Sequence, residues 1–119
     1  MQYVILIYQG TTPLPNTPEW ETLSKEQQQA VYHDYAALNS NPKVTQGLPL
    51  GLPEKAKTVR VDNGVALATD GPFIDAKGAV GGYVVLEADD MEAAVELAAT
   101  IPAARHGGAV EVRAAETYW

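Results

Sequence analysis

Short apolar segments alternate with polar, proline- and glycine-rich segments along the chain, and this pattern predicts strands and helices in turn. Val4 to Tyr8 is a continuous apolar, β-branched run, typical of an interior strand buried on both faces. Thr58–Val61 and Val65–Thr69 flank Asn63-Gly64, the dipeptide favoured at the tip of a β-hairpin. Further extended segments are predicted over residues 44–52, 83–88 and 109–113.

Two helices are predicted between these strands. The first begins at Ser24, because Ser24 and Gln27 have the spacing of a capping box, and it runs to about Leu38. Its predicted buried stripe consists of Val31, Tyr35 and Leu38. The second helix begins at Asp89 to Glu92 and ends before Pro102. Its predicted buried stripe consists of Met91, Ala94, Val95, Ala98 and Ile101.

The order of elements predicts an α+β fold, ferredoxin-like βαββαβ with an extra hairpin. Two helices can cover only one face of such a sheet, yet the residues of strand 4–8 are apolar on both faces. The second face therefore needs a cover. We expect a homodimer in which a second copy presents the same face. The alternative is that the loop from Gly10 to Trp20 folds over it.

Composition narrows the class of protein. A chain of 119 residues fits a single domain, 1–119. The absence of cysteine excludes disulfides and thiolate metal sites. A formal net charge of −7 argues against nucleic acid as a partner and fits a cytoplasmic protein. No apolar run approaches the roughly 20 residues of a membrane span, and no signal peptide is recognised.

Several blocks of the chain, in the right order, resemble one known family. They are Met1 to Tyr8, Gly47-Leu48-Pro49-Leu50, Thr58 to Val61, Asp70-Gly71-Pro72-Phe73, and Ile101 to Arg105 followed by Gly107 to Arg113. Together they resemble the YCII-related proteins of the DGPF type. The resemblance implies a dimeric α+β barrel made of two ferredoxin-like sheets face to face. In one departure from the family pattern, Lys77 is followed by Gly78 where the family usually has glutamate.

Candidate catalytic residues are Asp70 and His106. Asp70 either caps its own turn through backbone N–H groups or faces a cleft, where a raised pKa would suit it to acid or base catalysis. His106 lies in a glycine-flanked turn, where an exposed surface position is the alternative. Neither a cofactor nor a metal is expected, because the two histidines are far apart and no phosphate-binding loop occurs.

A ligand pocket is predicted to use Tyr8, Tyr83, Lys77 and Arg113. Aromatic walls are usual in pockets, and the two cations match family blocks that would hold an anionic ligand. Ion pairs with Asp75 or Glu111 are the alternative for the cations. The resemblance leaves three functions open: small-molecule binding in the barrel, a cofactor-independent enzyme of lyase or oxygenase type using Asp70, and a regulatory module that works with a sigma factor.

Overall fold

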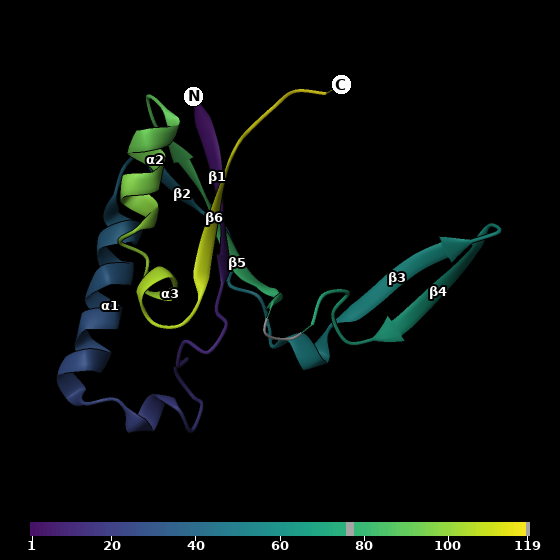
Figure 1. Cartoon of the computed structure of the whole chain (residues 1–119), viewed down its shortest axis with the longest axis horizontal. Helices are drawn as coiled ribbons and strands as arrows, with labels where there is room; N and C mark the ends of the chain where they lie inside the picture. The colour runs from purple at the N-terminus through teal and green to yellow at the C-terminus, as the bar shows by residue number, and fades with distance from the viewer. Residues whose placement is uncertain (76–77, 119) are drawn as a thin grey trace.

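The computed structural model describes residues 1–75 and 78–118. Its strands are β1 (Gln2–Tyr8), β2 (Val44–Gln46), β3 (Lys57–Asp62), β4 (Val65–Asp70), β5 (Val80–Glu87) and β6 (Ala109–Ala114). Its helices are α1 (Lys25–Ser40), α2 (Met91–Ala98) and α3 (Pro102–Arg105), with short 3-10 turns η1 (Trp20–Thr22) and η2 (Pro53–Lys55). The main sheet has the antiparallel order β2-β5-β1-β6, and β3 pairs with β4 in a separate sheet (Figure 1). This α+β architecture is compatible with a ferredoxin-like fold.

One face of the main sheet forms the core beneath the helices. Tyr3, Ile5 and Ile7 of β1 are buried, and Ile5 stands between Val84 of β5 and Val112 of β6. The helices supply Leu38, Ala94, Ala98 and Ala103 to the same core. The alternation of side chains along a strand places Val4, Leu6 and Tyr8 on the opposite face.

This opposite face, which we call the open face, carries no helix in the described chain. It consists of Val4, Leu6 and Tyr8 of β1, Tyr83 and Val85 of β5, and Glu111 and Arg113 of β6. All three helices lie on the other side of the sheet (Figure 1). The loop from Gly10 to Trp20 lies against α1, where the buried Trp20 ring packs edge-on against Tyr32 with 5.4 Å between ring centroids. The open face is therefore partly exposed in a single chain.

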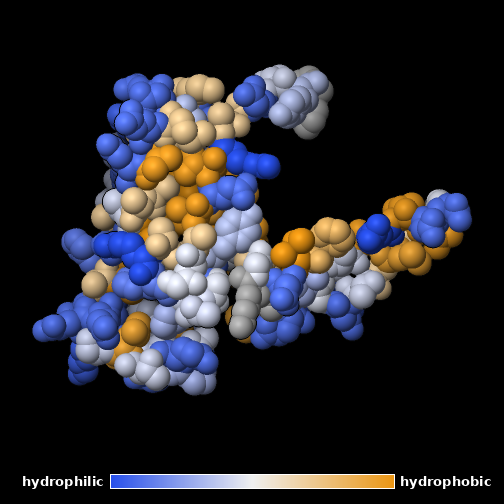
Figure 2. Space-filling model, in the orientation of Figure 1, coloured by the Kyte–Doolittle hydropathy of each residue, from blue (hydrophilic) through white to orange (hydrophobic). Residues whose placement is uncertain are grey.

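The strands β3 and β4 form a ribbon, which we call the arm, that projects away from the main sheet on the side of the open face (Figure 1). Asn63 and Gly64 connect the strands with positive φ angles of 50° and 78°, as a tight hairpin turn requires. The residues Val59, Val61, Val65 and Leu67 are exposed along the arm (Figure 2). Nothing in the described chain packs over these side chains.

The starts of α1 and α2 follow from local hydrogen bonds. Ser24 Oγ accepts from the backbone N–H of Gln27 at 3.1 Å, and Gln27 Oε1 accepts from the backbone N–H of Ser24 at 2.8 Å, so the predicted capping box is confirmed. Asp90 caps α2 by accepting from the N–H of Ala93 at 2.8 Å. None of the described helices combines the length and the apolar character needed to cross a bilayer.

Two predicted details differ from the structure. On α2, Ala94 and Ala98 are buried as predicted, but Met91 and Val95 are exposed. They border a shallow groove with Val110 and Val112, because α2 lies over the β6 edge of the sheet. Strand β2 ends at Gln46 because glycine and proline follow. The next residues still run along β5, where the N–H of Gly47 donates to the Tyr83 carbonyl at 3.1 Å.

Candidate functional site

Tyr8 lies where the main sheet meets the base of the arm. The register between β1 and β5 shifts between Ile7 and Tyr8, so a local irregularity sets the position of Tyr8. Its hydroxyl donates weakly to Glu111 Oε1 at 3.5 Å, and Arg113 Nε lies 3.0 Å from Glu111 Oε2. Tyr8, Glu111 and Arg113 therefore form a polar row on the open face. Arg113 thus forms the ion pair with Glu111 that was the alternative to a ligand-binding role.

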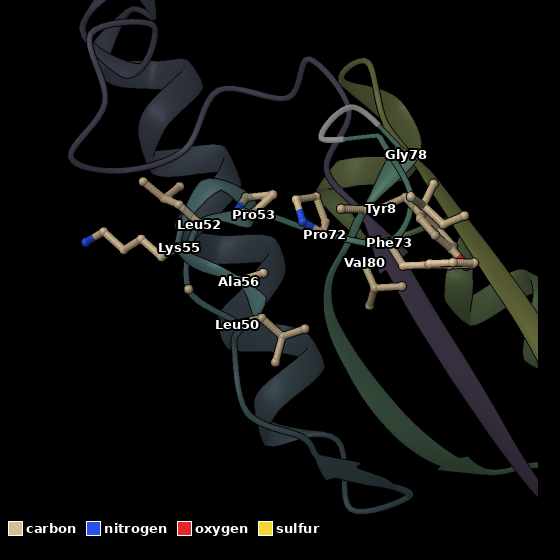
Figure 3. A pocket seen from close by; sticks show the side chains of 13 residues that line it. Tyr8, Leu50, Leu52, Pro53, Lys55, Ala56, Pro72, Phe73, Gly78 and Val80 are labelled. Carbon is tan, nitrogen blue, oxygen red and sulfur yellow. The ribbon is translucent and has the colours of Figure 1, made fainter. Parts of the chain in front are cut away.

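A cavity of about 440 Å³, which we call the arm-base cavity, opens beside Tyr8. Figure 3 shows Tyr8, Phe73 and Val80 on one side of it and Leu52 on the other. Most of the wall is apolar, and the volume lies within the range of about 300–1,000 Å³ that is usual for small-molecule sites. The hydrocarbon part of the Lys55 side chain lines the wall, while its ammonium points away from Tyr8 (Figure 3).

Asp70 ends β4 at the base of the arm. Its carboxylate forms an ion pair with Lys57, the residue opposite it in β3, and the two side chains are 83% and 67% exposed. Other groups hold the turn that follows: the Gly71 N–H donates to the Ala56 carbonyl at 2.7 Å, and Thr58 Oγ1 donates to the Gly71 carbonyl at 2.8 Å. In a single chain Asp70 is thus an exposed ion-pair partner, and a role inside a barrel depends on a second chain.

His106 lies on another part of the molecule, directly after α3. It is exposed and borders a small cavity of about 120 Å³ with Thr12, Leu23 and Val31. Thr12 Oγ1 is buried there and has no hydrogen-bond partner among the described residues. The structure does not bring His106 and Asp70 to a common cavity, since His106 borders a cavity beside α1 whereas Asp70 is the last residue of the arm.

A third cavity, of about 320 Å³, lies between α1, the first half of β5 and residues 46–49, and we call it the helix-side cavity. Tyr83 lines this cavity rather than the one beside Tyr8. Gln9 and Tyr35 also line it, and burial raises the pKa of the Tyr35 hydroxyl, an effect partly offset by a hydrogen bond from Gln9. Sequence reasoning missed Gln9. The available signal was a polar amide directly after a fully apolar strand.

The predicted ligand residues do not line one common cavity. Tyr8 and Arg113 belong to one polar row on the open face, Tyr83 borders the helix-side cavity, and Lys77 lies outside the described residues. Within the described residues, no three histidine, aspartate or glutamate side chains gather as a metal site requires. Both larger cavities are apolar and contain few polar groups.

Comparison with known proteins assigns the chain to a family. No curated protein matches the chain. The family model of the YCII-related domain matches residues 1–116, which is nearly the whole chain. The match spans the main sheet, the helices and the arm. The chain therefore belongs to the YCII-related domain family.

Proposed function

We propose that this protein is a homodimeric YCII-related domain of the DGPF type that binds a small apolar molecule in the arm-base cavity. In this proposal the open faces of two copies pack together as a dimeric α+β barrel. The single observation that carries it is the position of Tyr8. Its side chain lines the cavity, and its hydroxyl meets Glu111 on the open face.

The dimer is supported by the composition of the open face. Val4, Leu6 and Val85 are apolar and partly exposed, and Tyr83 retains 41% of its surface. The polar Glu111 and Arg113 lie beside them on β6. An apolar centre with a polar rim is the usual anatomy of a protein interface.

The choice of ligand follows from the walls of the cavity. Phe73, Pro72, Leu50 and Leu52 supply apolar surface, and the ammonium of Lys55 points outward. A ligand gains affinity here by burying apolar area. Arg113 lies at the far end of the polar row, and together with Lys77 it is proposed to hold an anionic group on a larger ligand.

Two matched variants test the dimer. Light scattering of the wild type should give about twice the chain mass of 12.7 kDa. Val4→Lys should give a monomer, because a buried unpaired charge costs several kcal/mol. Val95→Lys places the same charge at an exposed position in the groove between α2 and β6, away from the open face, and should leave the mass unchanged. A wild-type mass of one chain would overturn the dimer.

A neutral fluorescent probe tests the cavity. N-phenyl-1-naphthylamine should bind with enhanced fluorescence, and Tyr8→Ala should raise its Kd about 10-fold, since a well-buried aromatic contact is worth more than about 1 kcal/mol. The control is Tyr32→Ala, which truncates a tyrosine on α1. Equal Kd values for the two variants would contradict a ligand site beside Tyr8.

Other roles stay predictions. An enzyme using Asp70 or His106 as acid or base requires a partner chain that encloses Asp70, which is exposed in a single chain. A regulatory module working with a sigma factor, and a cytoplasmic location, likewise rest on the family resemblance and composition.

A further inference from the structure

We propose that the helix-side cavity is a second ligand site, separate from the arm-base cavity, and that it takes a small neutral molecule with an apolar body and one hydrogen-bond donor group. The two cavities share no lining residue in the described chain. This inference does not depend on the dimer or on ligand binding beside Tyr8.

The geometry of the cavity suits a ligand of that size. Its volume is about 320 Å³, and Ile7, Leu38 and Val84 form an apolar wall that is continuous with the core. Leu48 and Pro49 border it from the segment that follows β2. Apolar walls with a few polar groups are the usual composition of small-molecule sites.

Gln9 supplies the acceptor that favours a ligand with a hydrogen-bond donor. Its Oε1 is buried and has no hydrogen-bond partner among the described residues. A buried acceptor without a partner is unfavourable, and a donor that reaches it removes this cost. Gln9 lines the cavity, and the terminal torsion of a glutamine side chain is soft, so we expect this oxygen to accept a hydrogen bond from a donor bound there.

The charge of the walls selects a neutral ligand. Among the described lining residues there is no lysine, arginine, histidine, aspartate or glutamate. The Tyr35 hydroxyl is protonated at neutral pH, and burial raises its pKa further above the usual value of 10.0. An ionised ligand would lose its hydration without gaining a counter-charge, which is strongly unfavourable. The amides of Asn39 and Gln46 offer further neutral contacts.

Glycines fix the shape of the site. A Cβ at Gly47 would lie 2.4 Å from the Tyr83 carbonyl oxygen and 2.6 Å from its ring, and a Cβ at Gly81 would lie 2.7 Å from Gln9 Cγ. Tyr83 can therefore lie against residue 47, and Gln9 against residue 81, only because both residues are glycines. At Gly82, by contrast, a Cβ would meet nothing closer than 3.9 Å, and the nearest atoms belong to Leu48 and Pro49. Gly82→Ala thus narrows the cavity without a clash.

Benzamide and benzoate form a matched pair of probes, because they have nearly the same shape and differ in charge and in N–H donors. In an NMR titration of the full chain at pH 7.5, benzamide should shift the amide signals of Gly47, Gly81 and Gly82 saturably. We expect a Kd of about 1 mM, as befits so small a ligand. Benzoate should bind at least about 10-fold more weakly.

Four variants locate the contact. Gln9→Met keeps the length of the side chain but removes the amide, and it should raise the benzamide Kd about 3- to 10-fold. Gln29→Met on the exposed side of α1 is its matched control. Gly82→Ala should weaken binding by narrowing the cavity, and it serves as the test if Gln9→Met does not fold. Tyr32→Phe, on α1 but outside the cavity, should leave the Kd unchanged.

Four results would overturn the proposal. The first three are equal affinity for benzamide and benzoate, shifts confined to residues of the arm-base cavity, and no saturable shift at about 10 times the expected Kd. Binding of benzamide that is insensitive to both Gln9→Met and Gly82→Ala would overturn it as well. Loss of the Tyr8 site alone would leave these results unaffected, so the two proposals fail independently.

Discussion

The main sheet and the arm are both antiparallel, both are rich in β-branched residues, and they differ in what covers them. Ile5 of the main sheet is fully buried between two neighbouring strands and beneath the helices, whereas Val61 of the arm is 69% exposed. A two-stranded ribbon without such cover is at best marginally stable in water. The comparison teaches that an apolar strand pattern predicts pairing but not the layer that buries it.

The largest expected difference between the two regions is in hydrogen exchange. Backbone amides of β1 should exchange only on global unfolding, while the amides of β3 and β4 open locally. We expect exchange in the arm to be at least about 100-fold faster, as measured by NMR or mass spectrometry. Equal protection of the two regions would mean that a partner covers the arm. The difference in burial between main sheet and arm would then hold for the isolated chain only.

Truncation of core and arm side chains sharpens the comparison energetically. Ile5→Ala leaves a cavity in the core and should lower the free energy of unfolding by about 2–5 kcal/mol. Val61→Ala in the arm should change it by less than about 0.5 kcal/mol. Urea unfolding followed by circular dichroism measures both. A cost above about 1 kcal/mol for Val61→Ala would reveal a covering surface.

Buried and exposed titratable groups should also differ. Burial raises the pKa of Tyr35 in the folded chain above the usual value of 10.0, so the unfolded chain loses this proton at lower pH. The contribution of Tyr35 to stability is therefore fully present below pH 10 and decreases as the pH rises further. Unfolding curves at neutral and alkaline pH should show a smaller decrease for Tyr35→Phe than for the wild type. Parallel decreases would contradict this assignment.

A small effect on stability is expected at the base of the arm. Asp70→Asn removes an exposed ion pair with Lys57 and should cost less than about 1 kcal/mol. A melting curve in low and high salt checks this, because screening should reduce the difference further. A large loss of stability would mean that Asp70 is enclosed by a second chain, as its proposed barrel position requires.

The sequence was sufficient for features that depend on neighbours along the chain. The capping box of Ser24 and Gln27, the paired segments around Asn63-Gly64, and the buried Val31 and Leu38 all follow local rules. The run from Val4 to Tyr8 was correctly predicted as a strand, but because it is apolar on both faces its sequence did not show which set of side chains enters the core.

Features that depend on distant parts of the chain were not predictable. Met91 and Val95 are exposed because α2 lies over the edge of the sheet. Helical periodicity in the sequence does not show where on a sheet a helix packs. The division of Tyr8 and Tyr83 between two cavities depends on the path of residues 47–50 along β5. Gln9 faces a cavity because Gly81, far along the chain, leaves room for it.

The central place of β1 has a consequence for synthesis on the ribosome. Tyr3 pairs with Leu86 on one side and with Ala114 on the other, so β1 can pair with β5 only after residue 87 has been made and with β6 only after residue 114. The arm pairs neighbours such as Asp62 and Val65 and can form early. Contacts between distant residues slow folding because long loops must close first. During translation the apolar first strand therefore stays unpaired until β5 has been made, and we expect aggregation of the nascent chain to be most favourable in this interval.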